Sequence, residues 1–294
     1  MDFLQRTCRD IRSLKIQGAE NVATAAILAV TDVIKRSRAP SKKILMSEVE
    51  RATKKLLETR PTEAEMEDYL TFINRSLRRI ESENIHIVKR QILKKIGRLL
   101  EHKHHARHKI AVHGAKLIKR NSIVFTHCHS STVVAVVKEA HKAKKVVVHN
   151  TETRPFFQGR ITAKDLARSR IPVIHFVDSG ARVALKGADI MVIGADSITS
   201  THVYNKIGSE LIAVAAKELR VPLYVCASLW KFTPHKEEIE ERPATEVWAR
   251  APKGIRIRNP AFEPIPFSLI KGIVCEEGVL RPNAFVKRAR RLLR

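Results

Sequence analysis

The chain has 294 residues, of which 44% are hydrophobic and 29% are charged, enough for a globular protein with a sizeable buried core. Its 55 lysines and arginines outnumber 30 acidic residues, which gives a formal net charge of +25. No apolar run approaches the roughly 20 residues of a membrane-spanning helix, no signal peptide is evident at the start, and the four cysteines show no disulfide or zinc spacing. We therefore expect a cytoplasmic protein with no membrane partner.

The first part of the chain carries helical patterns and little else. The helical stretches are residues 21–35, 62–73 and 86–119, separated from one another by Pro40, Pro61 and polar segments. Ser47 and Glu50 have the spacing of a capping box at the start of a further helix. The sequence thus predicts a helical domain over residues 1–115.

From Ser122 onward, short β-branched runs alternate with helical stretches. The predicted strands are residues 122–126, 145–150, 173–177, 190–193, 223–226 and 270–275, and the predicted helices are residues 133–140, 162–168, 179–185 and 210–219. This alternation is typical of a mostly parallel sheet with helices on both faces. We therefore expect an α/β protein in which a Rossmann-like domain, residues 116–294, follows the helical domain and carries the site.

The positive charge is concentrated in two places. Residues 86–120 contain eleven lysines and arginines against one acid, and residues 281–294 contain six against none. Such a field attracts polyanions at low salt. Aromatic residues make up only 5% of the chain, however, and no interleaving of aromatic with basic residues is evident. We therefore interpret the charge as a solvated surface, with nucleic-acid binding that is only weak and non-specific.

A thiol and a carboxylate follow two of the predicted strands. Cys128 comes at the end of the first strand, and Asp196 follows the strand at 190–193. The carboxyl ends of parallel strands face one crevice, where ligands bind, so this pair is a candidate for acid and base catalysis. The alternative for Cys128 is a buried, inert thiol. Strand alternation points His127 and His129 to the opposite face, which argues against a cysteine–histidine dyad or a metal there.

Further polar residues follow the same strands. Ser130 and Ser131 open the helix after Cys128, in a position suited to an anion and able to lower the thiol pKa. Arg154 and Gln158 lie in the loop after the second strand, which suits phosphate or sugar recognition unless the loop is merely solvated.

A lysine also precedes a predicted helix. Asn205 and Lys206 stand beside its N-terminus, where a phosphate would sit. Neither a P-loop nor a dinucleotide fingerprint is present. The histidines at 102, 104, 105 and 108 include a pair at i and i+4, but no acid or cysteine nearby completes a metal site.

Several motifs together resemble a known family. They are THCHSST at 126–132, ETRPFFQG at 152–159, GADSI at 194–198, NKIG at 205–208, WKFTP at 230–234 and NPAFEPIP at 259–266. In this order they resemble the archaeal ribose-1,5-bisphosphate isomerases, relatives of methylthioribose-1-phosphate isomerase and of the regulatory subunits of eukaryotic initiation factor 2B.

The resemblance implies an isomerase that converts α-ribose 1,5-bisphosphate to ribulose 1,5-bisphosphate, without metal or redox cofactor. It implies Asp196 as the ring-opening acid and Cys128 as the base at C2, with these roles open to exchange. Arg60, Arg154, Asn205 and Lys206 would hold the phosphates, and Lys231 matches another site lysine. Ser130, Ser131 and Gln158 complete the expected substrate-binding set. An AMP effector and a homo-oligomer, dimer or hexamer, are also expected.

One position departs from the family pattern. The enzymes' N-terminal Arg-Gly-Ala loop appears here as Gln17-Gly18-Ala19, so a phosphate-binding arginine is replaced by a neutral residue. The alternatives are a non-catalytic regulator that binds initiation factor 2 or a nucleotide, and an isomerase acting on methylthioribose 1-phosphate.

Overall fold

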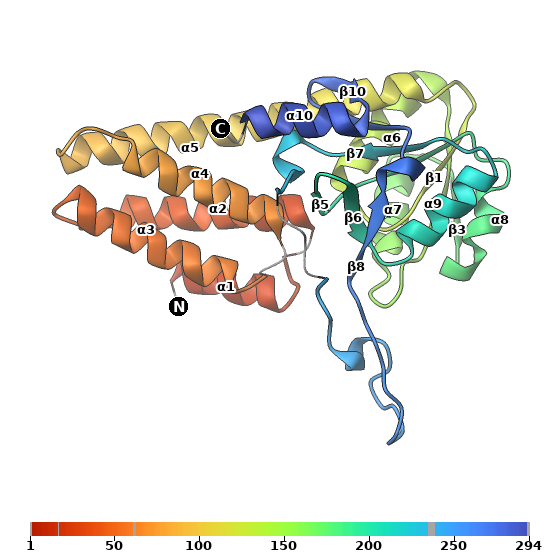
Figure 1. The fold of residues 1–294 in the computed structure, drawn as a ribbon, viewed down its shortest axis with the longest axis horizontal. Coiled ribbons are helices and arrows are strands. Elements are labelled where there is room, and N and C mark those ends of the chain that lie inside the picture. The colour runs from red at the N-terminus through yellow and green to blue at the C-terminus, as the bar shows by residue number, and fades with distance from the viewer. Residues whose placement is uncertain (1, 17, 61–62, 235–238, 293–294) are drawn as a thin grey trace. The chain divides into compact units, whose positions relative to one another are not determined.

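The computed structural model describes residues 2–16, 18–60, 63–234 and 239–292. The chain divides into two compact units, Met1–His105 and Ala106–Arg294, and the division falls inside one long helix (Figure 1). The expected α/β class is confirmed, because the described residues of unit 1 form helices without strands and a mostly parallel sheet with helices forms unit 2. The domain boundary after residue 115 stays a prediction.

Unit 1 is built from helices that pack around α2. Its elements are α1 (Phe3–Arg12), α2 (Ala19–Arg36), α3 (Lys42–Leu57), α4 (Ala64–Arg78) and the first part of α5 (Ile85–Leu117). Helix α2 contacts α1, α3 and α4, and its residues Ala23, Ile27 and Val30 are fully buried. Their three- and four-residue spacing places them on one face, which explains why α2 occupies the centre of the unit.

The start of α3 differs from the sequence prediction. Ser41 caps this helix, since its hydroxyl accepts the amide of Ile44 at 3.4 Å. The capping box predicted at Ser47 and Glu50 is therefore wrong, and Ser47 lies inside α3, where its hydroxyl accepts from Arg51 at 2.7 Å. Pro40 explains the earlier start, because the chain cannot continue a helix through it and Ser41 is the first residue able to cap the next one.

Unit 2 contains a seven-stranded sheet. Its strands are β1 (Ile123–Thr126), β2 (Val147–Thr151), β3 (Val173–Phe176), β4 (Ile190–Ile193), β7 (Leu223–Cys226), β9 (Gly272–Cys275) and β10 (Gly278–Leu280). They lie in the order β10-β9-β7-β4-β1-β2-β3, and only β10 is antiparallel to its neighbour. The chain builds outward from β1 through β2 and β3, then returns to place β4 on the other side of β1. The crevice between β1 and β4 is thus the topological switch point, where open α/β sheets bind ligands.

Helices cover both faces of this sheet. They are α6 (Ser131–Lys144), α7 (Gln158–Ala167), α8 (Ala181–Leu185), α9 (Ser209–Glu218), α10 (Pro282–Leu292) and the end of α5. Neighbouring residues of β1 face opposite sides: Phe125 joins a core with residues of α8, α9 and α10, and Val124 joins one with residues of α5 and α6. This alternation requires both faces of a strand to be apolar, which the β-branched runs supply.

A small antiparallel sheet and a long arm were absent from the sequence prediction. Strands β5 (Ser197–Ile198), β6 (His202–Lys206) and β8 (Phe262–Pro266) form the small sheet directly after β4. Residues 239–261, here called the arm, leave the body of unit 2 and return before β8 (Figure 1). In the described part of the chain, no helix is long and apolar enough to cross a membrane.

Candidate active site

Cys128 lies just beyond the end of β1, in a backbone conformation that takes it out of the strand. Its φ is 66°, in the left-handed region that non-glycine residues adopt rarely. Two threonines hold it there: the Cys128 amide donates to Thr153 Oγ1 at 3.0 Å, and its carbonyl accepts from Thr162 Oγ1 at 2.9 Å. Backbone strain held by side-chain hydrogen bonds at a strand end is a feature of functional sites.

The charges of Asp196, Asp178 and Lys206 act on the Cys128 thiol, and the residue as a whole is half-buried. Burial of the thiol, helped by the Asp196 carboxylate, raises the pKa of Cys128 to about 12, although the His129 amide and Lys206 act in the opposite direction. The sequence suggested a pKa lowered by the start of α6. That expectation is wrong, because the loss of water and the nearby carboxylate outweigh the helix terminus.

Asp196 reaches the same place from β4. Strands β1 and β4 pair in parallel, with Phe125 opposite Met191, so three residues further on Cys128 and Gly194 leave the sheet at one level. The fit is tight, since a Cβ on Gly194 would lie 2.8 Å from Ser130 Oγ. The Asp196 amide donates to the Tyr204 carbonyl at 2.9 Å, which ties this residue to the small sheet. Cys128 and Asp196 thus follow the two strands that border the switch point.

His127 directly follows β1 and precedes Cys128. Its ring is buried, with Nδ1 2.5 Å from Thr151 Oγ1 and Nε2 3.2 Å from the Ile207 carbonyl oxygen. A carbonyl can only accept, so Nε2 carries the proton and Nδ1 accepts from the threonine hydroxyl. Burial lowers the pKa of His127, which keeps the ring neutral, and Lys206 lowers it further. Lys206 therefore lies within electrostatic reach of both His127 and Cys128.

Lys206 and Asn205 end β6, and both are buried. Asn205 Nδ2 donates to Ser209 Oγ at 3.0 Å, and Ser209 Oγ donates to the Lys206 carbonyl at 2.6 Å. The sequence suggested that a phosphate would sit at the start of α9. Instead Glu263 caps this helix, because its carboxylate accepts the Glu210 amide at 2.7 Å.

Two opposing effects act on the pKa of the capping carboxylate, Glu263. Burial raises the pKa of Glu263, and the amides of Glu210, Gly208 and Ser209 oppose that rise. An acidic side chain thus already occupies the positive end of the α9 dipole. Lys206, rather than the helix start, is the group near Cys128 that could attract a phosphate.

The loop after β2 is fixed by a residue that the sequence analysis missed. Asp178, beyond the end of β3, accepts the amides of Thr153 and Arg154, each at 2.7 Å. Its charge also raises the pKa of Cys128. The rule that pointed to Asp196, a carboxylate directly after a parallel strand, would have found Asp178 as well.

The two arginines of this loop stack on one aromatic ring. Arg154 and Arg160 lie 5.1 and 3.7 Å from the centre of the Phe157 ring. Arg154 is exposed and donates to the Val247 carbonyl at 3.0 Å, so its guanidinium is tied to the arm. Gln158 begins α7, and its Oε1 is buried without a hydrogen-bond partner in the described chain.

The remaining predicted residues of unit 2 are placed as follows. Ser130 caps α6 by accepting the Val133 amide at 3.3 Å, and Ser131 is the first residue of that helix. Lys231 is buried at the end of a short 3-10 helix, η2 (Leu229–Lys231), which follows β7. The described residues contain no group of three or more His, Cys, Asp or Glu side chains that could hold a metal ion.

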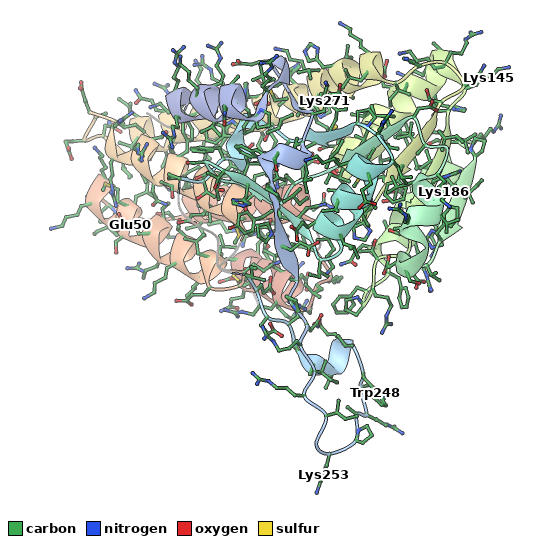
Figure 2. All side chains as sticks on the ribbon, turned by 45° about the vertical axis from the view of Figure 1, so that its right-hand side comes forward. Glu50, Lys145, Lys186, Trp248, Lys253 and Lys271 are labelled. Atoms are coloured by element: carbon green, nitrogen blue, oxygen red, sulfur yellow. The ribbon has the colours of Figure 1, made fainter. Side chains whose placement is uncertain are left out.

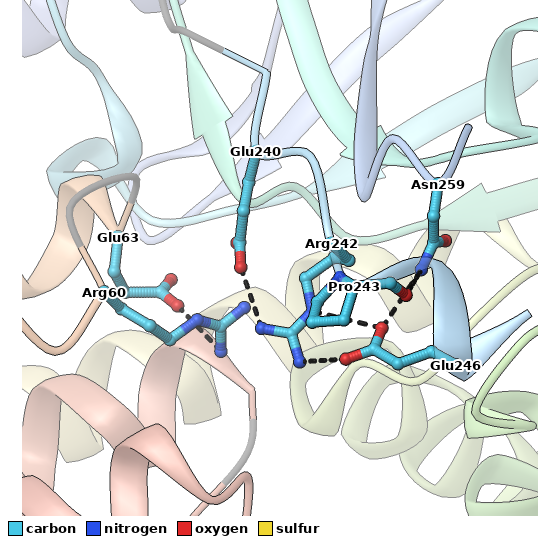
Figure 3. A network of polar contacts seen from close by, with 7 residues as sticks. All are labelled: Arg60, Glu63, Glu240, Arg242, Pro243, Glu246 and Asn259. Carbon is cyan, nitrogen blue, oxygen red and sulfur yellow. Dashed lines mark hydrogen bonds and ion pairs between the residues drawn. The ribbon is translucent and has the colours of Figure 1, made fainter. Parts of the chain in front are cut away.

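In unit 1, the predicted substrate-binding residues are described by themselves. Gly18 precedes α2 with a φ of 81°, and Ala19 is the first residue of that helix. Arg60 forms an ion pair with Glu63 at 3.3 Å (Figure 3). Gln17 lies outside the described residues. The part that these residues play in binding remains a prediction from the sequence.

The comparisons with known proteins identify the family of the chain. The sequence profile of the Initiation factor 2 subunit family matches residues 15–282. The chain belongs to this family. Ribose 1,5-bisphosphate isomerase of Pyrococcus furiosus is 36% identical over 290 residues, which cover 94% of this chain and 90% of that protein.

Two further relatives show the range of the similarity. Methylthioribose-1-phosphate isomerase of Pelotomaculum thermopropionicum is 32% identical over 295 residues, with 92% of this chain and 81% of that protein covered. Among solved structures, a translation initiation factor eIF-2B of Pyrococcus horikoshii superposes with a TM-score of 0.82 at 25% identity, over 97% of this chain and 99% of that chain.

The raised thiol pKa makes a prediction that needs no substrate. A thiol of pKa about 12 is less than about 0.1% ionised at pH 8, so iodoacetamide should alkylate Cys128 far more slowly than a free thiol. The rate should rise about tenfold per pH unit, because only the thiolate reacts. Mass spectrometry of the Cys128 peptide gives the rate.

Asp196→Asn should accelerate this alkylation, because it removes a negative charge that raises the pKa of Cys128. Glu218→Gln, a change at an exposed carboxylate of α9, is the control and should leave the rate unchanged. Rapid alkylation of the unaltered protein that levels off below pH 9 would contradict the raised pKa.

Proposed function

We propose that this protein is an isomerase that converts α-ribose 1,5-bisphosphate to ribulose 1,5-bisphosphate. The observation that carries the proposal is the pairing of Cys128 with Asp196 at the switch point, where the carboxylate acts electrostatically on the thiol. The similarity to isomerases over nearly the whole chain supports the same reaction class. A thiol and a carboxylate at one crevice supply the proton-transfer groups that an aldose–ketose isomerisation needs.

The anomeric phosphate sets the chemistry, because it blocks a free aldehyde. The base removes the proton from C2 as the bond between C1 and the ring oxygen breaks, and the acid gives a proton to that oxygen. The resulting C1=C2 enol then takes a proton at C1 and loses the proton of its C2 hydroxyl, which leaves the ketone. The phosphate stays on C1 throughout, and protons are conserved.

These reaction steps require Cys128 and Asp196 to carry one proton between them. In the free site this proton lies on sulfur, since the Cys128 pKa is about 12. With Asp196 as acid and Cys128 as base, the proton passes from the thiol to the carboxylate before C2 is attacked. With the roles exchanged, the thiol protonates the ring oxygen directly and the carboxylate takes the C2 proton.

The phosphate groups would be held by cations. Lys206 is buried and within electrostatic reach of Cys128, so it suits the phosphate on C1, next to the reacting bond. Arg154, Asn205, Gln158, Ser130, Ser131 and Lys231 complete the proposed contacts in unit 2, and Gln17, Gly18, Ala19 and Arg60 those in unit 1. AMP as an effector and a homo-oligomer, dimer or hexamer, belong to the same proposal.

The deciding experiment is incubation of the purified protein with ribose 1,5-bisphosphate, with detection of the 2-ketose. Methylthioribose 1-phosphate serves as the competing substrate, and AMP is added to test activation. A second candidate function, a non-catalytic regulator of initiation factor 2, is favoured by the similarity to the eIF-2B structure. Absence of turnover on both sugars together with tight binding to initiation factor 2 would support that alternative.

Gln17 provides a separate prediction about substrate affinity. Gln17→Arg should lower KM for ribose 1,5-bisphosphate several-fold, because a charge-assisted hydrogen bond to phosphate is roughly twice as strong as a neutral one. Little change in kcat is expected, since a phosphate remote from C2 is held equally in ground and transition states. Steady-state kinetics of both forms measure the effect. Unchanged KM with full kcat would show that this position does not contact the phosphate.

A further inference from the structure

Hydrogen bonds and ion pairs hold the base of the arm, residues 239–261, together. The outgoing and returning segments of the arm pair through two backbone hydrogen bonds. The Arg242 amide donates to the Asn259 carbonyl at 2.9 Å, and the Ala261 amide donates to the Glu240 carbonyl at 2.8 Å. The Arg242 guanidinium bridges Glu240 at 2.9 Å and Glu246 at 2.6 Å (Figure 3). Such bidentate and networked pairs fix geometry more firmly than isolated surface pairs.

The acidic residues of the arm form ion pairs at its base. Arg258 binds Glu241 with two guanidinium nitrogens at 3.0 and 3.1 Å. Asn259 Nδ2 donates to Glu246 at 3.1 Å. The acids of residues 239–261 are therefore engaged at the base, and no acid occurs in residues 247–257, here called the outer segment.

The outer segment combines cations with exposed apolar side chains. Arg250, Lys253 and Arg256 are exposed, and none forms an ion pair with another described residue. Trp248 is 50% exposed and Ile255 49%. Figure 2 shows Trp248 and Lys253 at the far end of the arm, away from the sheet. An exposed tryptophan among unpaired cations indicates an interaction surface, since such groups gain nothing from the fold itself.

The end of the arm is a tight turn that presents its lysine. The Ile255 amide donates to the Pro252 carbonyl at 3.4 Å, and Gly254 between them has a φ of 88°. This is the arrangement of a type II turn, which needs a glycine at its third position. Lys253 therefore stands at the tip with its side chain in solvent.

We propose that the outer segment binds single-stranded nucleic acid, with Trp248 stacking on a base and Arg250, Lys253 and Arg256 contacting phosphates. A flat aromatic beside a run of cations is the recognised chemistry for unpaired strands. A duplex would leave Trp248 unused, because its bases are already stacked. The outer segment thus places one aromatic side chain beside three cations, in a chain that has few aromatic residues overall.

The test measures fluorescence anisotropy of labelled 12-nucleotide oligouridylate and oligodeoxythymidylate, a 12-base-pair RNA duplex and polyglutamate, over a range of salt concentrations. The unaltered protein should bind both single strands more tightly than the duplex and polyglutamate. Trp248→Ala should weaken single-strand binding by about tenfold with an unchanged salt dependence. Arg250→Gln/Lys253→Gln/Arg256→Gln should flatten the logarithmic salt dependence by about 2, the value for three phosphates at about 0.7 each.

The matched control removes the same charge elsewhere on unit 2. Lys164, Lys186 and Lys217 are exposed and outside the arm, so Lys164→Gln/Lys186→Gln/Lys217→Gln should bind as the unaltered protein does. Circular dichroism confirms the fold of each variant. Equal weakening by the arm and control triples would overturn the proposal in favour of general surface charge. Binding of polyglutamate as tight as that of RNA and insensitive to Trp248→Ala would overturn it in favour of an acidic protein partner. A preference for one single strand identifies whether RNA or DNA is bound.

Discussion

Replacing Cys128 by serine is expected to lower turnover of ribose 1,5-bisphosphate by about 10²-fold or more, and Asp196→Asn is expected to do the same. Both residues leave neighbouring parallel strands at the switch point, and the Asp196 carboxylate raises the pKa of the Cys128 thiol. A serine hydroxyl and an asparagine amide keep the size of the originals, but neither exchanges a proton in the working pH range. Steady-state kinetics give kcat and KM for each variant.

Cys8→Ser is the matched control for the thiol. Cys8 is another buried free cysteine, which lies in α1 and donates weakly to the Lys55 carbonyl at 3.7 Å. This variant should keep full turnover. The loss of turnover in the double variant Cys128→Ser/Asp196→Asn should be much smaller than the product of the two single losses. The two residues act as a unit on one proton, so removing the second costs little once the first is gone. Turnover of the Cys128→Ser variant at the original rate would assign the C2 proton to another base.

The sheet could be predicted from the sequence because its strands carry an unambiguous local signal. Strand β4 (Ile190–Ile193) is buried throughout, and a fully buried parallel strand reads as an uninterrupted apolar run. The small sheet gave no such signal. Strand β5 has two residues, Ser197–Ile198, and its formation depends on pairing with β6 and β8 rather than on its own composition.

The site could be predicted as far as strand ends determine it. The positions of Cys128 and Asp196 follow from topology, which the alternation of strands and helices specifies. The pKa of Cys128 does not, because it depends on how completely the folded chain removes water from the sulfur. The cap on α9 is likewise a long-range contact: Glu263 follows Glu210 by more than fifty residues, and no local pattern joins them.

Gly159→Ala is expected to lower the free energy of unfolding by about 3 kcal/mol, and the melting temperature by about 6 °C or more. A Cβ at Gly159 would lie 1.7 Å from the Thr151 carbonyl oxygen and 3.0 Å from the Glu152 carbonyl carbon. Both are backbone atoms, so no side-chain rotation relieves the overlap. The start of α7 would have to move away from β2, against the bond from Asn150 Nδ2 to the Gly159 carbonyl at 2.7 Å. Thermal unfolding followed by circular dichroism measures the change.

The same displacement should reach the reaction, because α7 supplies the Thr162 hydroxyl that binds the Cys128 carbonyl. Turnover of the Gly159→Ala variant, measured well below its melting temperature, should therefore fall as well. Gly97→Ala is the matched control: Gly97 lies inside α5, a Cβ there would meet nothing within 4 Å, and alanine should stabilise the helix by about 0.5–1 kcal/mol. Equal melting temperatures for the two variants would show that β2 and α7 are not packed as closely as this contact requires. A Gly159→Ala variant that melts early yet keeps full turnover below its transition would instead separate the packing of α7 from the placement of Cys128.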